Sequence, residues 1–473
     1  MVILADDLGS GDVQALNPDS KIPTPNLNAL AASGMTFHDA HSPSAVCTPT
    51  RYGLLTGRYC WRSRMKKGVL NGYSPPLIEK DRPTFAQMLS SKGYNTAIVG
   101  KWHLGMNIPM LPEPPNDRFK GDPGVDFEGT ITDSPNDRGF DYSFLVTASL
   151  DMAPYVYVRN GRFTQKPTIQ QPAVKFPHFV RAGPRSEDFV IEETLDKLIS
   201  EATVQIGTMA KKDDPFLLYL PLTGPHKPCQ PATRFQGKTA LGEYGDFVHQ
   251  VDASVGRVLE AIRESGEEDN TLVIFTSDNG SYMYRYTDGR TDHVEDSGVQ
   301  GFKEQRHRSN GPYRGTKADI WEAGHRVPFF VRWPGSVEAG SQCKQTICLT
   351  DIYATLAEIA DEPLADNVAE DSFSIMRMLA GSQNPRPAPV IHHSGSGMFA
   401  LRSGPWKLIA GNGSGGREAP KGKPFEKPFQ LFNMTTDVGE SHDLAEEQSE
   451  KVAHLTATLE DIRSHGSRAT VKK

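Results

Sequence analysis

The sequence contains no long apolar run, no closely spaced cysteine pair and no excess of basic residues. No stretch approaches the roughly 18 consecutive apolar residues of a membrane-spanning helix. The five cysteines, at positions 47, 60, 229, 343 and 348, include no C-x-x-C pair, which excludes zinc-ribbon and thioredoxin-type motifs. The formal net charge is −7, from 51 basic and 58 acidic residues, so nucleic acid is not an expected partner.

The chain is long enough, at 473 residues, for one large domain and a smaller one. Nearly continuous apolar segments alternate with amphipathic ones, a pattern typical of an α/β sheet covered by helices on both faces. We predict strands at 2–5, 94–100, 214–222 and 271–280, and helices at 24–34, 82–93, 186–211 and 246–266.

A segment rich in turn-forming residues near 380–388 reads as a linker. We therefore expect a catalytic domain at 1–384 and a small subdomain at 385–473. The expected elements of this subdomain are strands at 389–393, 398–402, 406–410 and 429–433, followed by a helix at 446–464.

Polar residues follow each of the four predicted strands. Asp6 and Asp7 follow the first strand, Lys101 and His103 the second, His226 the third, and Asp278 and Asn279 the fourth. Each group alone is an ordinary polar exit from a strand. Because sites in open α/β sheets lie outside the carboxyl ends of the strands, the four groups together indicate one convergent site.

Asp6, Asp7, Asp278 and Asn279 offer only oxygen donors. Adjacent carboxylates repel each other unless they are protonated or bridged by a cation. Oxygen-only donor sets suit calcium or magnesium rather than zinc. The alternative is that these residues form turns or helix caps; two such pairs at two strand ends favour a divalent cation.

Cys47 precedes a predicted helix in "VCTPTRYGLLTGR", with Pro49 in its first turn and Arg51 one turn further along. A helix N-terminus and an arginine both favour an anion. The thiol could be structural, a redox or metal ligand, or a nucleophile, and the strand-end groups favour the nucleophile. Lys101 and His103 lie two residues apart on an extended segment, which suits an anion between them.

Six motifs occur in the order found in one known family. "CTPTR" followed by "LLTGR" matches the C-x-P-x-R signature, and "ADDLG", "GKWHLG", "PHKP", "TSDNG" and "GTK" accompany it between residue 2 and about residue 335. The sequence thus resembles the formylglycine-dependent (type I) sulfatases, arylsulfatase-like members of the alkaline phosphatase superfamily. The resemblance implies a large mixed sheet sandwiched by helices, with a small C-terminal domain of a short antiparallel sheet and one helix.

The resemblance also implies a modified nucleophile. A formylglycine-generating maturation enzyme would oxidise Cys47 to an aldehyde, whose hydrate attacks sulfur with one hydroxyl and expels sulfate through the other. The metal ligands implied are Asp6, Asp7, Asp278, Asn279 and residue 47, around calcium or, alternatively, magnesium.

The remaining catalytic roles are implied by matched position. Arg51, Lys101 and Lys317 would hold the sulfate oxygens where charge develops. His226, with Lys317, would protonate the leaving oxygen, and His103 would accept the proton that triggers sulfate release.

Substrate-binding candidates lie outside these motifs: Arg58, Arg62, His307, Arg308 and His393. The basic residues are either a solvated face or a subsite for a polyanionic sugar. The long segments 104–185 and 281–313 exceed ordinary connections and are expected to shape the pocket. Sulfated carbohydrates are the expected substrates, with aryl sulfates as an alternative.

Two other functions stay open from the sequence. One is a phosphodiesterase or phosphonate monoester hydrolase on the same scaffold, and the other is a non-catalytic relative that binds sulfated glycans. The apolar run directly after Met1 is short for a buried strand, so we expect the natural chain to begin upstream with a signal peptide, and the protein to be exported to a periplasmic, extracellular or lysosome-like compartment.

Overall fold

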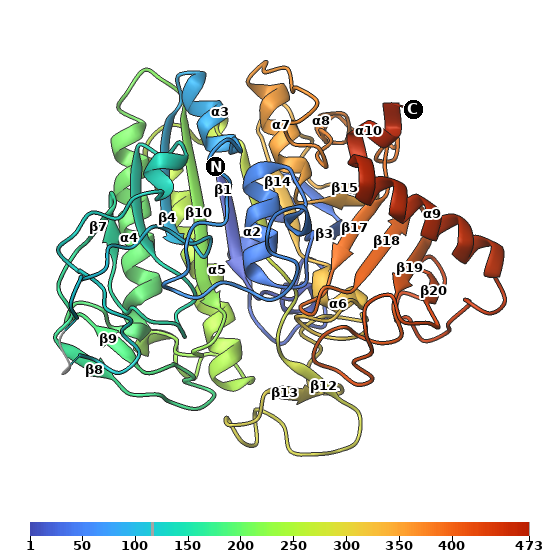
Figure 1. The fold of residues 1–473 in the computed structure, drawn as a ribbon, viewed down its shortest axis with the longest axis horizontal. Helices are drawn as coiled ribbons and strands as arrows, with labels where there is room; N and C mark the ends of the chain where they lie inside the picture. Colours follow the sequence, from blue (N-terminus) through green and yellow to red (C-terminus); the bar gives the residue numbers. More distant parts are fainter. Residues whose placement is uncertain (115–117, 473) are drawn as a thin grey trace.

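The computed structural model describes residues 1–114 and 118–472. Within these residues a ten-stranded mixed sheet runs through the centre of the larger part of the molecule, in the order β15-β2-β14-β11-β1-β10-β4-β5-β6-β7 (Figure 1). Its strands are β1 (Val2–Asp6), β2 (Met35–Phe37), β4 (Asn95–Lys101), β5 (Tyr142–Val146), β6 (Val158–Arg159), β7 (Arg162–Phe163), β10 (Phe216–Pro225), β11 (Val273–Ser277), β14 (Phe329–Arg332) and β15 (Ser341–Cys343).

The five central strands, β11, β1, β10, β4 and β5, are all parallel. Val2 of β1 pairs with Tyr219 on one side and with Ile274 on the other. Because side chains alternate along a strand, Ile3 packs into one apolar layer and Leu4 into the opposite one. Burial on both faces explains why these strands read as nearly continuous apolar runs.

Helices cover both faces of this sheet, as predicted. One apolar layer contains α1 (Pro25–Ala32), α4 (Thr194–Met209) and α5 (Gly242–Glu264). The opposite layer contains α2 (Cys47–Thr56), α3 (Phe85–Ser91) and α7 (Asp351–Ile359).

Two helices begin later than the sequence pattern predicts. The helix expected at 82–93 starts at Phe85, because the Thr84 hydroxyl accepts a hydrogen bond from the Gln87 backbone N–H and caps it. The helix expected at 186–211 starts at Thr194, after a 3₁₀ turn at Ile191–Glu193. The strand expected at 214–222 continues to Pro225, which carries its end to the residue before His226.

The C-terminal part forms a separate antiparallel sheet in the order β17-β18-β19-β20. Its strands are β17 (Val390–His393), β18 (Phe399–Ser403), β19 (Trp406–Ala410) and β20 (Gln430–Asn433). Helix α9 (Ser449–His465) packs Leu455, Leu459 and Ile462 against this sheet, close to the predicted boundaries. A second short helix, α10 (Ser467–Lys472), follows the one helix that was expected.

Small elements complete the fold: helices α6 (Glu322–His325) and α8 (Met376–Leu379), and the strand pairs β3 (Ala40–His41) with β16 (Ile347–Cys348), β8 (Ile169–Gln171) with β9 (Gly183–Arg185), and β12 (Tyr284–Tyr286) with β13 (Gly301–Lys303). All five cysteines are free and buried. No helix in the described ranges is both long and apolar enough to cross a membrane.

Candidate active site

The polar groups that follow the predicted strands converge at the carboxyl edge of the central sheet. Asp6 ends β1, Lys101 ends β4, and Asp278 directly follows β11. These three side chains are almost completely buried. They meet because β11, β1, β10 and β4 are parallel and consecutive in the sheet, so polar residues far apart in the sequence lie at neighbouring strand ends.

Each buried carboxylate is paired with a cation. Lys101 Nζ lies 2.7 Å from Asp6 Oδ2. Lys317 Nζ lies 2.6 Å from Asp7 Oδ1. The Arg51 guanidinium donates to Asp278 Oδ2 through Nε at 3.0 Å and Nη2 at 2.8 Å. Three acids and three bases thus form one largely buried cluster, in which Coulomb forces are stronger than in water.

The donor chemistry of this cluster fits a hard divalent cation. Asp6, Asp7, Asp278 and Asn279 present carboxylate and amide oxygens, the donors that calcium and magnesium prefer. Asn279 Oδ1 is buried and has no hydrogen-bond partner among the described residues, which is the mark of an atom reserved for a ligand. Asp7 has a left-handed backbone, with φ of 67°, an unusual conformation for a non-glycine residue that is common at functional sites.

Cys47 is the first residue of α2 and points into this cluster. Lys317 Nζ lies 3.3 Å from its Sγ, and the Asp6 carboxylate lies 3.6 Å from the same sulfur. Burial raises the pKa of the Cys47 thiol to about 12, so the unmodified side chain is a protonated and weak nucleophile. One turn further along, Arg51 reaches the same cluster, as the helical spacing predicts.

Two histidines flank the cluster. The Nε2 atom of His103 lies 2.8 Å from the Leu70 carbonyl, to which it donates as N–H, and its Nδ1 is buried without a partner in the described structure. His226 Nδ1 lies 2.6 Å from the Lys227 carbonyl, which leaves Nε2 facing Asp7 at 3.6 Å. Burial, aided by nearby lysines, holds the pKa of both imidazoles well below the usual value.

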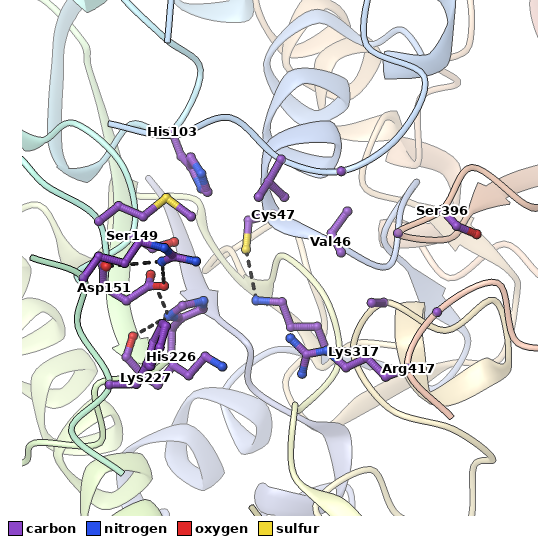
Figure 2. A pocket seen from close by; sticks show the side chains of 18 of the residues that line it. Val46, Cys47, His103, Ser149, Asp151, His226, Lys227, Lys317, Ser396 and Arg417 are labelled. Atoms are coloured by element: carbon purple, nitrogen blue, oxygen red, sulfur yellow. Dashed lines mark hydrogen bonds and ion pairs between the residues drawn. The ribbon is translucent and has the colours of Figure 1, made fainter. Parts of the chain in front are cut away.

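A cavity of about 430 Å³ opens onto Cys47, His103, His226 and Lys317 (Figure 2). The segment 104–185 supplies much of one wall, including Ser149, Asp151, Phe179 and Arg181; residues 115–117 of that segment lie outside the described structure. The loop before β20 supplies Gly415, Gly416 and Arg417 to the opposite wall.

Four charged residues that line the cavity were not identified from the sequence: Asp151, Arg181, Lys227 and Arg417. Lys227 lies inside the "PHKP" motif, whose only assigned residue was His226. Asp151 and Arg417 lie on loops without periodicity, so no local pattern marks them.

The five predicted substrate-binding residues do not line this cavity. Arg62 pairs with Asp371 at 2.8 Å and donates to the Ile462 carbonyl of α9. Arg58 pairs with Glu370 at 3.3 Å, and exposed Arg308 with Glu304 at 3.2 Å. His307 lies 2.8 Å from Asp12, and His393 is buried in β17. Their role in substrate binding stays a prediction.

Known proteins resemble this chain in sequence and in fold. The family model described as "Sulfatase" matches residues 1–362. The chain belongs to the sulfatase family. This result confirms the family resemblance, the alkaline-phosphatase-like fold and the activity class, which is that of a sulfuric ester hydrolase.

Two relatives and one solved structure illustrate this membership. An N-acetylgalactosamine-6-O-sulfatase from Bacteroides thetaiotaomicron is 32% identical, over 98% of this chain and 92% of its own length. The steryl-sulfatase of Homo sapiens is 30% identical over 85% of this chain and 73% of its own length. A structure from a study of glycosaminoglycan metabolism by Bacteroides thetaiotaomicron superposes with a TM-score of 0.84, at 30% identity and 98% coverage of both chains.

Proposed function

We propose that this sulfatase removes sulfate esters from sulfated sugars, with a formylglycine made from Cys47 as nucleophile and a calcium ion beside it. The observation that carries this proposal is the position of Cys47. It begins α2, it faces a cavity, and it lies 3.3 Å from Lys317, within a cluster of buried carboxylates and cations.

Calcium and formylglycine would each supply one kind of chemistry. Calcium, held by Asp6, Asp7, Asp278 and Asn279, would stabilise charge at the sulfuryl group. The formylglycine hydrate would supply two hydroxyls on one carbon, one to attack sulfur and one to release sulfate. Magnesium is the alternative cation, because it prefers the same oxygen donors.

The chain's own residues position the ester and move protons. Arg51, Lys101 and Lys317 would hold the sulfate oxygens, and their charges would stabilise the transition state there. His226 Nε2 faces the cavity side of Asp7 and would give its proton to the leaving sugar oxygen. A bound sulfate beside His226 would raise the pKa of its imidazole, so that the imidazole would carry the proton that it donates.

His103 would act at the other end of the reaction. Its Nε2–H is held by the Leu70 carbonyl, so the free Nδ1 atom is an acceptor. An acceptor at this place would take the proton whose removal releases sulfate. His103 also has a left-handed backbone, with φ of 59°, a conformation that is unusual for a non-glycine residue and common at functional sites.

The cavity walls favour a substrate that carries hydroxyl groups. Ser149 Oγ and Asp151 Oδ1 line the cavity, are buried, and have no hydrogen-bond partner in the described structure. Such atoms cost free energy unless a ligand pairs with them, and sugar hydroxyls would do so. The N-acetylgalactosamine-6-O-sulfatase relative, aligned along almost the whole chain, supports the same substrate class.

Sulfate release from matched esters tests this proposal. The panel contains N-acetylgalactosamine 6-sulfate, an aryl sulfate and their phosphate counterparts, with the Cys47 peptide analysed by mass spectrometry in the same preparation. We expect release from the sulfated sugar and an aldehyde at residue 47. Faster turnover of the phosphates would favour a phosphatase-type hydrolase, and binding without release by fully modified protein would favour a non-catalytic relative. An unmodified thiol in fully active enzyme would refute the nucleophile.

A further inference from the structure

Two cations inside the cavity have no acidic partner. Lys227 and Arg417 line the same cavity as Cys47, and no described carboxylate lies at ion-pair distance from either; Asp151 and Asp7 attract Lys227 only from further away. The other cations of the site, Arg51, Lys101 and Lys317, are all paired with carboxylates. The difference sets Lys227 and Arg417 apart from the catalytic cluster.

The environment of each cation shows that it is held in place rather than extended into solvent. Arg417 Nη1 is buried and has no hydrogen-bond partner among the described residues. Its backbone is fixed because the Arg417 N–H donates to Asp319 Oδ1 at 2.5 Å. Lys227 Nζ lies 4.9 Å from the centre of the Phe179 ring, a cation–π contact with another residue of the cavity wall.

The two side chains approach each other from opposite walls. Figure 2 shows Lys227 extending from the wall beside His226 and Arg417 extending from the far side, with Lys317 and Cys47 further into the cavity. Burial, followed by repulsion from the Arg417 guanidinium, lowers the pKa of Lys227 to about 8. Two like charges that repel each other in a half-enclosed space are a cost that a bound anion would remove.

We propose that Lys227 and Arg417 bind a second anionic group of the substrate, separate from the sulfate that is cleaved. The group is either a second sulfate on the same sugar or the carboxylate of a neighbouring uronic acid, because both present oxygen anions to a lysine and an arginine. This inference rests on the proposed sugar sulfatase function and narrows its substrate class to sugars with at least two negative charges.

Three probes separate the sources of this second charge. N-acetylgalactosamine 6-sulfate carries one anion, N-acetylgalactosamine 4,6-disulfate carries a second sulfate, and a disaccharide of hexuronic acid linked to N-acetylgalactosamine 6-sulfate carries a carboxylate. We expect kcat/KM to be about 10-fold or more higher for at least one doubly anionic probe, as a charged hydrogen bond provides. The preferred probe identifies the anion.

Substitutions of Arg417 and Lys227 test whether the preference for a doubly anionic probe arises in the cavity. Arg417→Gln and Lys227→Gln should each reduce the preference for the doubly anionic probe about 10-fold, and Arg417→Lys should restore part of it. The side chain of Lys227 is dispensable for the His226 contact, which uses the Lys227 backbone carbonyl. Lys421→Gln is the matched control, because it removes one positive charge from an exposed position on the same loop and should leave the preference intact.

The outcomes are distinguishable from a failure of the proposed function. If no probe releases sulfate, the sugar sulfatase function itself is wrong. If all three release sulfate at similar kcat/KM, or if the preference is the same in wild type, Arg417→Gln and Lys227→Gln with unchanged melting temperatures, the second anion site is wrong and the function stands.

Discussion

Among the described residues, two buried clusters of charged side chains can be compared, and they differ in what they face. The catalytic cluster contains Asp6, Asp7, Asp278, Arg51, Lys101 and Lys317 and adjoins a cavity. A second one, here called the histidine cluster, contains Asp39, His41, Glu322, His325, His392, Lys407 and Glu440. None of its members lines that cavity.

The histidine cluster joins the large sheet region to the C-terminal sheet. Lys407 of β19 lies between Glu440 at 2.7 Å and Glu322 of α6 at 3.0 Å. The rings of His325 and His392 stack with centroids 3.8 Å apart. Its charges satisfy one another across the junction, so its contribution is to hold the two parts together. Both clusters have buried polar atoms without a hydrogen-bond partner among the described residues, His392 Nε2 in the histidine cluster and Asn279 Oδ1 and His103 Nδ1 beside the catalytic cluster, but only the catalytic cluster adjoins the cavity.

Chelation should show the difference between the two clusters most strongly, because only the catalytic cluster is expected to hold a cation. Removing the divalent cation from the purified enzyme should lower sulfate release at least about 1,000-fold, because several kcal/mol of charge stabilisation are lost, and calcium should restore it. Atomic emission on the untreated protein identifies the ion. Full activity in metal-free enzyme would contradict the assignment of Asp6, Asp7, Asp278 and Asn279.

Lys407→Met should destabilise the protein by about 3–5 kcal/mol, since it leaves Glu440 buried without its cation and takes one of two cations from Glu322, which also pairs with Arg326. The measurement is the free energy of unfolding in urea, with Lys238→Met, at an exposed position, as the control. The control should stay within about 0.5 kcal/mol of wild type. An unchanged free energy for Lys407→Met would show that the histidine cluster does not support the junction.

Lys317→Met should reduce activity and leave stability nearly unchanged, the reverse of the effect expected for the histidine cluster. We expect kcat to fall about 100-fold, since one preorganised charge at the sulfate is lost. The melting temperature should change little, because Asp7 keeps the hydrogen bond that Asn279 Nδ2 donates at 2.6 Å and the cavity lets water reach the place of the lost ammonium. Kinetics and thermal unfolding on one preparation measure both effects. A large loss of stability with normal turnover of the folded fraction would place Lys317 among the structural cations.

The sequence predicts the catalytic cluster better than the cavity walls. Asp6, Lys101 and Asp278 follow apolar strands directly, so the topology of a parallel sheet brings them together. Asp151 and Arg417 reach the cavity from loops, whose path depends on tertiary contacts that no local pattern encodes.

The same limit explains why the residues expected to bind substrate do not line the cavity. Arg62 pairs with Asp371, 309 positions away, and His307 with Asp12, 295 positions away. A run of basic residues does not reveal such distant partners. The helix starts at Phe85 and Thr194 differ from the prediction for a related reason, since capping contacts and a 3₁₀ turn decide them.

The smallest predicted effect concerns pH and the histidine cluster. Burial, together with neighbouring charges such as Lys407, lowers the pKa of His325 and His392 well below the usual 6.5. These imidazoles are neutral in the folded protein, whereas the unfolded chain takes up protons below about pH 6.5. Stability that is present above that pH is therefore lost on acidification, by up to about 1.4 kcal/mol per pH unit for each histidine.

His392→Gln should flatten this dependence. Between pH 6.5 and 5.5 the variant should lose about 1 kcal/mol less of its unfolding free energy than wild type, because one of the two groups no longer titrates. Glutamine keeps an N–H donor for the Ser42 carbonyl, which His392 Nδ1 contacts at 3.2 Å. His454→Gln, at an exposed position of α9, should follow wild type at every pH. Parallel curves for wild type and His392→Gln would mean that His392 is not held neutral, and that the histidine cluster tolerates an added proton as readily as a solvent-exposed site.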